Sequence, residues 1–482
     1  MAGVRPPTAA TRRKLTMLTV CAGAFMATLD TSMVSISLPL MARELQASLP
    51  AISWVMMAYL IVNASLLLSS SQLGDLWPTG RLFVAGMLIF CLAAAICGWL
   101  TQLWQLFLAR AGQGLGAALM LGVAPKIITL IFPEGERGLP FGLFSTAFAS
   151  GVTVGAPLGG LIAAHWGWPW IFLINLPIGG LALLVGGRQL FGLRADTAGL
   201  KGQVDWCGGL FFTLSIALLM WALMRVRTQG WQHPVVWVAL GGAALALATM
   251  LLVERRQPRP LLAGVLWRRW AFSLGAMAVV LTFAPVMGTF FLLPFYLEEI
   301  FHLPTQKIGW LLAVLSLANG LISPLGGLYG DRWSNLAVLR IGALLILAGL
   351  GALWWLGPAA SVSQLALLFA VTGMGFGLFQ APNLNEMLRG MPSQVLGLAA
   401  GTNALLKNIG SLLGIALMVT VASWGEGEPT PLRPGYCLGW GCFASAFLTA
   451  ISLAALNLGL NLLPRGRLGG RRRHSDQVRG EQ

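Results

Sequence analysis

The sequence contains very little charge. Only 10% of its 482 residues are Asp, Glu, Lys or Arg, and 57% are hydrophobic. About a quarter of a soluble chain is usually charged. Acidic residues are the scarcest, with 16 Asp and Glu against 31 Lys and Arg. This composition excludes an ordinary soluble domain and predicts a membrane protein with many spans.

Histidine and cysteine are also scarce, and neither forms a recognisable motif. The four histidines fall in expected loops or in the C-terminal tail, and the six cysteines show no metal-ligand spacing. Cys437 and Cys442 lie near an expected outer helix end, where the alternatives are a disulfide between them and two free thiols. The sequence lacks a GxxxxGK[ST] phosphate-binding loop, which argues against an ATP-driven pump. We expect no enzyme activity, no metal site and no cofactor.

Long apolar runs fill most of the chain. Crossing a bilayer takes roughly 20 apolar residues, and fourteen runs of about this length are separated by charge, proline or polar turns. We therefore expect an all-α polytopic membrane protein with fourteen transmembrane helices. The expected spans are 15–41, 51–74, 81–100, 103–132, 139–164, 168–191, 204–224, 235–253, 270–297, 308–330, 337–357, 364–385, 395–424 and 436–463.

The spans are arranged as six, two and six. A glycine-aspartate pair follows the second span of each outer block, at Gly74-Asp75 and again at Gly330-Asp331. Two related six-helix bundles with a site at their interface are a recurrent transporter plan. The expected divisions are a basic tail at 1–14, a bundle at 15–191, two extra helices with linkers at 192–269, a bundle at 270–463 and a basic tail at 464–482.

The positions of the basic residues predict the orientation of the chain. Most of the 31 Lys and Arg lie in the two tails and in alternate loops. Positive residues in short loops stay on the cytoplasmic side, so we expect both termini in the cytoplasm and the spans in the cell (inner) membrane. Topology thereby accounts for the net charge of +15, and we do not expect nucleic acid as a partner.

One carboxylate, Asp30, lies inside the first span. Such a residue costs at least ~2.5 kcal/mol to insert, and it marks an ion or proton path. At about 1.5 Å per residue, Asp30 and Arg110 of the fourth span lie at similar depths, so they can meet or share a water-filled cavity. We predict that this pair couples transport to protons. The alternatives are an acid satisfied by the hydroxyls of neighbouring Thr and Ser residues, and an arginine bonded to backbone carbonyls.

Several stretches, taken in order, resemble the motifs of one transporter family. They are LDTSMVSISLP (Leu29–Pro39), the loops with Asp75 and Asp331, FLARAGQGLG (Phe107–Gly116), GVTVGAPLGG (Gly151–Gly160), WPWIFLINLPIG (Trp168–Gly179) and VDW (Val204–Trp206). On these residues the chain resembles the major facilitator superfamily, and within it the fourteen-span drug:proton antiporters of the EmrB/QacA type. The resemblance covers essentially the whole chain. It implies the major facilitator fold and export of small, amphipathic or drug-like molecules by alternating-access antiport with protons.

The resemblance also implies roles for loop residues. Asp75 and Arg81, with Asp331 and Arg332 in the second copy, would form a conformational latch on the cytoplasmic side. A static loop acid is the alternative for Asp75. In WPWIFLINLPIG, Asn175 matches the family pattern, and we interpret it as a determinant of helix geometry and packing.

The glycine-rich fifth span resembles the antiporter signature. Its residues are Gly151, Gly155, Pro157, Gly159 and Gly160. The family pattern has proline directly after the second glycine, whereas here Ala156 stands there and the proline follows it. A displaced proline still removes a helix hydrogen bond and permits a kink. Close helix packing is the alternative role for the glycines.

Candidates for the central cavity are Gln113, Asn403 and Lys407. Lys407 lies inside the thirteenth span with Asn403 one turn away, and snorkelling towards the interface is the alternative for this lysine. The expected partners are protons, the lipid bilayer and a small-molecule substrate, which could instead be an endogenous metabolite, amino acid or siderophore. We expect the chain to function as a monomer. A periplasmic adaptor protein is kept as an alternative further partner.

Overall fold

The computed structural model describes residues 9–133, 136–193, 205–255, 264–356, 360–391 and 393–422. Every regular element in these ranges is a helix, and 13 helical segments are long and apolar enough to cross a membrane. They coincide with the first thirteen expected spans, because each apolar run becomes one helical span. The fourteenth expected span, the C-terminal tail, Cys437 and Cys442 lie outside the described residues.

The N-terminal half contains six spans. They are α1 (Ala9–Glu44), α2 (Leu49–Leu76), α3 (Thr79–Cys97), α4 (Leu103–Ile131), α5 (Gly138–Trp166), and a sixth made of α6 (Pro169–Leu173), α7 (Asn175–Ala182), the π-helix η2 (Leu183–Gly187) and α8 (Arg188–Phe191). Helix α1 begins at Ala9, so part of the expected tail is helical. The two additional spans are α9 (Trp206–Gln229) and α10 (Pro234–Glu254).

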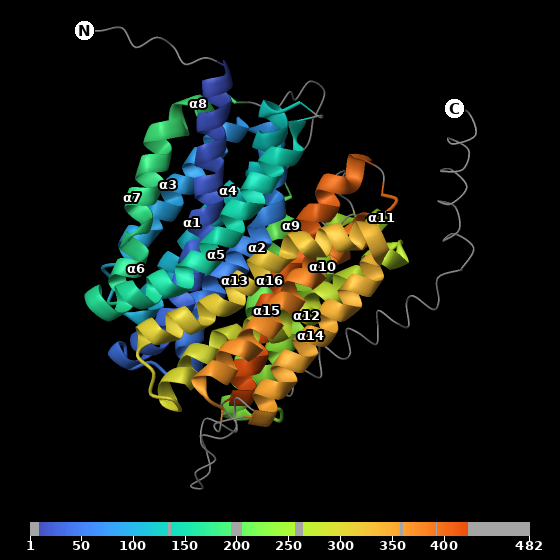
Figure 1. The fold of residues 1–482 in the computed structure, drawn as a ribbon. Coiled ribbons are helices and arrows are strands. Elements are labelled where there is room, and N and C mark those ends of the chain that lie inside the picture. Colours follow the sequence, from blue (N-terminus) through green and yellow to red (C-terminus); the bar gives the residue numbers. More distant parts are fainter. Residues whose placement is uncertain are drawn as a thin grey trace.

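The C-terminal half repeats the plan as far as the structure describes it. It contains α11 (Gly264–Trp267), α12 (Trp270–Glu299), α13 (Thr305–Tyr329), the π-helix η3 (Gly330–Ser334), α14 (Asn335–Leu356), α15 (Val362–Leu388) and α16 (Ser393–Ala422). In the N-terminal half α1 packs on α5, and α4 packs on α2 and α3. In the C-terminal half α12 packs on α16, and α15 packs on α13 and α14. The matching pairs confirm two related bundles (Figure 1).

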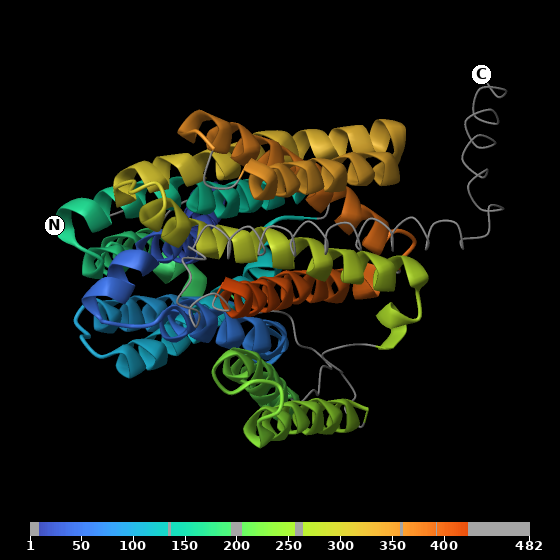
Figure 2. The ribbon, with the colours of Figure 1, turned by 90° about the horizontal axis from the view of Figure 1, so that it is seen from below.

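The two additional helices form a hairpin beside the bundles. Helix α9 packs on α10 and contacts α2 of one half and α16 of the other. Figure 2 shows this green pair set apart from the two bundles. The hairpin therefore covers one edge of the junction between the halves.

The halves meet chiefly through α5 and α13, and also through α2 and α16. A Cβ atom built on Gly160 would lie 2.8 Å from the Thr305 oxygen, and one on Gly309 would lie 2.6 Å from the Ala156 oxygen. Only glycine permits backbones to come this close. The halves are thus tightly joined at the end of the molecule farthest from the N-terminus, which we call the distal end.

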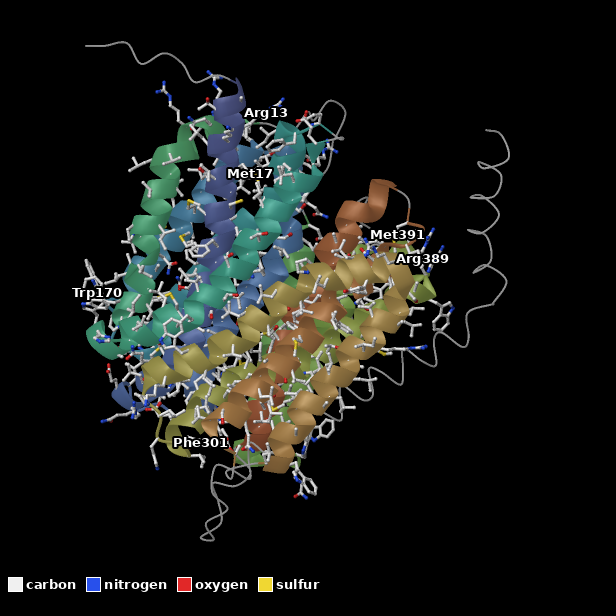
Figure 3. The ribbon with its side chains drawn as sticks, in the orientation of Figure 1. Arg13, Met17, Trp170, Phe301, Arg389 and Met391 are labelled. Carbon is white, nitrogen blue, oxygen red and sulfur yellow. The ribbon has the colours of Figure 1, made fainter. Side chains whose placement is uncertain are left out.

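At the other end, which carries Arg13 and which we call the N-terminal end, the same two helices separate (Figures 1 and 3). Leu143 on α5 and Leu325 on α13 are exposed there. At the distal end an ion pair between Arg43 and Glu298 also joins α1 to α12. The two halves are therefore joined at the distal end, and α5 and α13 diverge towards the N-terminal end (Figure 1).

Candidate functional site

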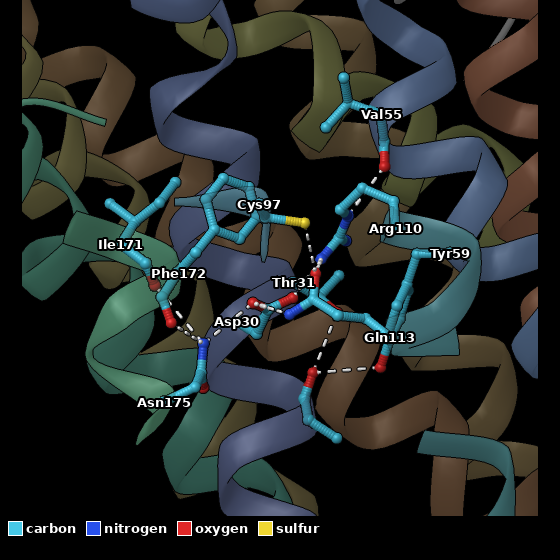
Figure 4. Close-up of polar contacts among 11 residues, drawn as sticks. Asp30, Thr31, Val55, Tyr59, Cys97, Arg110, Gln113, Ile171, Phe172 and Asn175 are labelled. Atoms are coloured by element: carbon cyan, nitrogen blue, oxygen red, sulfur yellow. Dashed lines mark hydrogen bonds and ion pairs between the residues drawn. The ribbon is translucent and has the colours of Figure 1, made fainter. Parts of the chain in front are cut away.

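Asp30 and Arg110 meet directly inside the N-terminal half (Figure 4). Arg110 Nη1 lies 2.6 Å from Asp30 Oδ2, and both side chains are 0% exposed. Helix α1 supplies the acid and α4 the base, at the similar depth that the rise per residue predicts. Of the two arrangements expected, a direct contact or a shared water-filled cavity, the structure shows the direct contact, sealed within packed helices.

Two amides complete the surroundings of the Asp30 carboxylate. Gln113 Nε2 donates to Asp30 Oδ1 at 3.2 Å, and Asn175 Nδ2 donates to the same oxygen at 3.1 Å. Gln113, expected to line a cavity, is fully buried in this network instead. Asn175 is the site residue that the sequence interpretation missed. The available signal was an amide inside an apolar span, since a buried amide needs a hydrogen-bond partner.

The hydroxyls near Asp30 play a different part from the one considered as an alternative. Thr28 Oγ1 donates to the Phe148 oxygen at 2.8 Å, and Ser32 Oγ donates to the Val152 oxygen at 2.9 Å. Both bonds tie α1 to α5. The carboxylate of Asp30 is therefore satisfied by the arginine and the two amides.

The Arg110 guanidinium is held on several sides. Its Nε donates to the Val55 oxygen of α2 at 2.9 Å, and its Nη1 also donates to Gln113 Oε1 at 2.7 Å. The Tyr59 ring lies below it, with 4.6 Å from Cζ to the ring centroid. Its Nη2 is buried without a hydrogen-bond partner among the described residues. A buried ion pair of this kind is strongly disturbed when one partner loses its charge.

The glycines of the fifth span pack α5 against α1. Gly151, Gly155 and Gly159 are spaced four residues apart and share one helix face. A Cβ atom on Gly155 would lie 2.6 Å from Ser32 Cβ, and one on Gly159 would lie 2.7 Å from Met33 Cα. Close packing, the alternative considered above, therefore describes their contacts.

Two residues of the same motif lie elsewhere. Gly160 faces α13 of the opposite half. Pro157 lies within α5, which continues as one helix to Trp166. A role of these residues in a kink specific to antiport stays a prediction.

Asp75, at the end of α2, is paired within its own half. Lys126 Nζ of α4 lies 2.5 Å from Asp75 Oδ1 and 2.8 Å from the Ser71 oxygen. The pair with Asp75 fixes Lys126 at the N-terminal end. Arg81 is exposed, and the ionic partner of Asp75 is Lys126 of α4.

The second copy of this loop is described only in part. The backbone of Asp331 lies in η3, its side chain is outside the described residues, and Arg332 is exposed. Nearby, Asn335 Nδ2 donates to Glu386 Oε1 at 3.1 Å. A latch made of Asp75, Arg81, Asp331 and Arg332 stays a prediction.

A second polar cluster crosses the middle of the C-terminal half. Lys407 Nζ donates to Gln380 Oε1 at 3.0 Å, and Gln380 Nε2 donates to Asn319 Oδ1 at 3.3 Å. Asn403, one turn before the lysine, is buried, and its Oδ1 has no partner among the described residues. The sequence predicted the lysine, but not Gln380 and Asn319, whose contacts depend on how α13, α15 and α16 are arranged.

Neither cluster has the composition of a metal site. Within the described residues no group of three or more His, Cys, Asp or Glu comes together. A cavity of about 350 Å³ lies between α3 and the end of the sixth span, away from both clusters, and Arg188 is on its wall. The chemistry that the clusters can perform is the exchange of a proton and the binding of charge.

Comparison with known proteins adds three findings. The sequence model of the Major Facilitator Superfamily matches residues 20–415. The chain is 28% identical over 403 residues to the riboflavin transporter RibZ of Clostridioides difficile (strain 630), covering 83% of this chain and 86% of that protein. It is 28% identical over 412 residues to the multidrug resistance protein Stp of Mycobacterium tuberculosis (strain CDC 1551 / Oshkosh), covering 85% and 76%.

The fold is also found among solved structures. The partially occluded, inward-open xylose transporter XylE from E. coli superposes with a TM-score of 0.63 over 94% of this chain and 98% of that one. The two sequences are 13% identical, so this likeness speaks for the fold alone.

Proposed function

This chain belongs to the Major Facilitator Superfamily, and we propose that it is a proton-coupled antiporter that exports small, amphipathic or drug-like molecules. It is a transport protein rather than an enzyme, and it works on a small molecule in a lipid bilayer. We assign it to the fourteen-span EmrB/QacA type. The observation that carries the proposal is the sealed pair of Asp30 and Arg110.

The proposed orientation places the N-terminal end in the cytoplasm. Arg81, Arg188, Arg255 and Arg389 lie at the helix ends of that side, and positive residues stay on the cytoplasmic side of a membrane. The conformation closed at the distal end is then the one that receives cargo from the cytoplasm.

Proton coupling follows from the chemistry of the pair. A proton that binds Asp30 removes its negative charge, so Arg110 loses its ionic partner while staying charged. Because the pair links α1 to α4, this loss weakens the contact that holds the two helices in their present positions. A proton that moves inward through 100 mV supplies about 2.3 kcal/mol, which drives the cycle.

The proton reaches Asp30 through the movement of the two halves in alternating access. Both side chains are 0% exposed, so Asp30 exchanges protons only when the two halves tilt. The contacts of Gly160 and Gly309 at the distal end must then part. We propose that cargo leaves and the proton enters through the opening formed there, and that both events require the same movement.

A second candidate is export of an endogenous metabolite, amino acid or siderophore. The similarity to a riboflavin transporter favours it, while the similarity to a multidrug resistance protein favours the first. Both candidates use the same pair and the same movement of the halves, so they differ only in the cargo.

Everted membrane vesicles test the proposal. With an imposed pH gradient, addition of a transported compound should release protons from vesicles that contain the wild-type chain and not from those with Asp30→Asn. Asp205→Asn is the matched control, because Asp205 is also buried but caps α9 through the Gly208 nitrogen. Undiminished uphill transport by a fully inserted Asp30→Asn variant would refute the assignment.

A further inference from the structure

The polar row in the C-terminal half includes side chains of α13 and α16, the helices through which the two halves chiefly meet. Its members come from α13 (Asn319), α15 (Gln380) and α16 (Lys407). Two helices of this row contact the opposite half, α13 through α5 and α16 through α2. A Cβ atom on Gly401 of α16 would lie 3.0 Å from Leu68 of α2. The row therefore joins the helices of the C-terminal half that lie at the junction.

Lys407 is placed at mid-membrane without an opposite charge. It lies halfway along the 30-residue helix α16. Its contacts are the Gln380 oxygen and the Phe283 ring, with 5.3 Å from Nζ to the ring centroid. No carboxylate of the described residues lies within ion-pair distance of it. Arg110, by contrast, has Asp30. Cations inside membrane spans mark substrate or ion sites, where they pair with an opposite charge.

The surroundings of the ammonium group are apolar on one side. The Phe283 ring packs on the Phe376 ring, with 4.8 Å between centroids. A ligand that reached Lys407 would place its charged group among Lys407, Gln380 and Asn319, and an aromatic or aliphatic body beside these rings. The row itself offers the amide donors of Gln380 and Asn319 alongside the ammonium group.

We propose that Lys407, with Gln380 and Asn319, binds an acidic group of the cargo, which is thus an amphipathic organic anion. The inference rests on the proposed function, because it names the class of molecule that the exporter carries. A carboxylate or sulfonate would take the place of the Gln380 oxygen at Nζ, and the Gln380 amide would then be free to donate to the same group. An organic cation would be repelled by the lysine.

Equilibrium binding tests this without any transport step. Three probes share one aromatic body: dansylglycine carries a carboxylate, dansylglycinamide is neutral, and dansylethylenediamine carries an amine. Their dansyl fluorescence is titrated with the full chain in detergent micelles. We expect the acid to bind at least about tenfold more tightly than the other two, since charge complementarity sets the discrimination.

Substitutions assign that preference to the row. Lys407→Met keeps the length of the side chain but removes its charge, so it should bind the three probes with about equal affinity. Lys407→Arg should retain the preference for the acid. Gln380→Met leaves the charge of Lys407 in place. It should weaken binding of the acid several-fold, while the acid stays the most tightly bound of the three probes. The Gln380 variant also reports on the row if Lys407→Met does not fold.

The outcomes separate this inference from the proposed function. Asp30→Asn should keep the preference for dansylglycine in micelles while it loses proton-coupled transport in vesicles. Equal affinities of the wild-type chain for the three probes, including no measurable affinity for the acid, would overturn the inference. So would a full preference for the acid in a folded Lys407→Met variant.

Discussion

Asn175 Nδ2 lies 3.1 Å from Asp30 Oδ1, so an amide of the sixth span completes the donors around the carboxylate of the first. The same Nδ2 lies 3.1 Å from the Phe172 oxygen, which fixes its direction at the start of α7. Asp30 is thereby tied to α4 through Arg110 and to α7 through Asn175. Protonation of Asp30 would therefore weaken its contacts with both helices.

Replacing Asn175 should weaken both the fold and the transport. Asn175→Ala leaves one lone pair of a buried carboxylate without its donor, which costs about 1–3 kcal/mol. We expect a lower unfolding temperature in micelles and several-fold slower proton-coupled transport. Asn63→Ala is the control, because Asn63 is also a buried amide of the N-terminal half but belongs to no contact with Asp30. Equal losses in the two variants would contradict a specific role for Asn175.

The Asp30–Arg110 pair should show strong energetic coupling. Removing one partner leaves a buried group uncompensated, and such changes cost about 3–5 kcal/mol. Asp30→Asn and Arg110→Met should each lower stability by this order, and the double variant should lose clearly less than the sum. Equilibrium unfolding of the four proteins in mixed micelles measures the coupling. Additive losses would show that the contact contributes little in the membrane-like environment.

Sequence reasoning predicted what depends on one helix at a time. An apolar run of sufficient length becomes a span whatever surrounds it, so the thirteen spans of the described residues appear where expected. The depths of Asp30 and Arg110 follow from the rise per residue, so their meeting could be predicted as well. The four-residue spacing of Gly151, Gly155 and Gly159 likewise predicts a shared face.

The remaining features depend on the arrangement of several helices. Asn175 reaches Asp30 because the sixth span lies beside α1, and the sequence of one span does not state which helices pack against it. Gln380 becomes the partner of Lys407, and Asn319 that of Gln380, only through the placement of α13 and α15. The pairing of Lys126 with Asp75 has the same origin, since it depends on α2 lying beside α4.

The contact of Gly309 with α5 offers a test of alternating access. Gly309→Leu places a side chain where a Cβ atom alone would lie 2.6 Å from the Ala156 oxygen, so the distal end cannot close as it does here. We expect proton-coupled export to be lost although the protein inserts. Gly320→Leu on the same helix is the control, because its Cβ would meet no atom within 4 Å. Normal export by Gly309→Leu would show that this closure is dispensable.

The ion pair of Arg43 and Glu298 should hold the distal end closed. It joins the ends of α1 and α12, which belong to different halves, so it exists only while that end is closed. Arg43 is largely exposed, and such pairs contribute only about 0–1 kcal/mol. That amount has little effect on unfolding, but it shifts the balance between two conformations of similar free energy.

Glu298→Gln should therefore enlarge the population that is open at the distal end. Spin labels on cysteines placed at Ser48 and Lys307, both on the distal end, report the separation of the halves as a distance distribution. The longer distances should gain weight in Glu298→Gln and, for the wild-type chain, at high salt, which screens exposed charges. Glu136→Gln is the matched control, because Glu136 pairs with Arg13 inside one half. Exchange of the two charges, with Arg43→Glu and Glu298→Arg together, should restore the original distribution, and a distribution that none of these changes alters would exclude the pair as a gate.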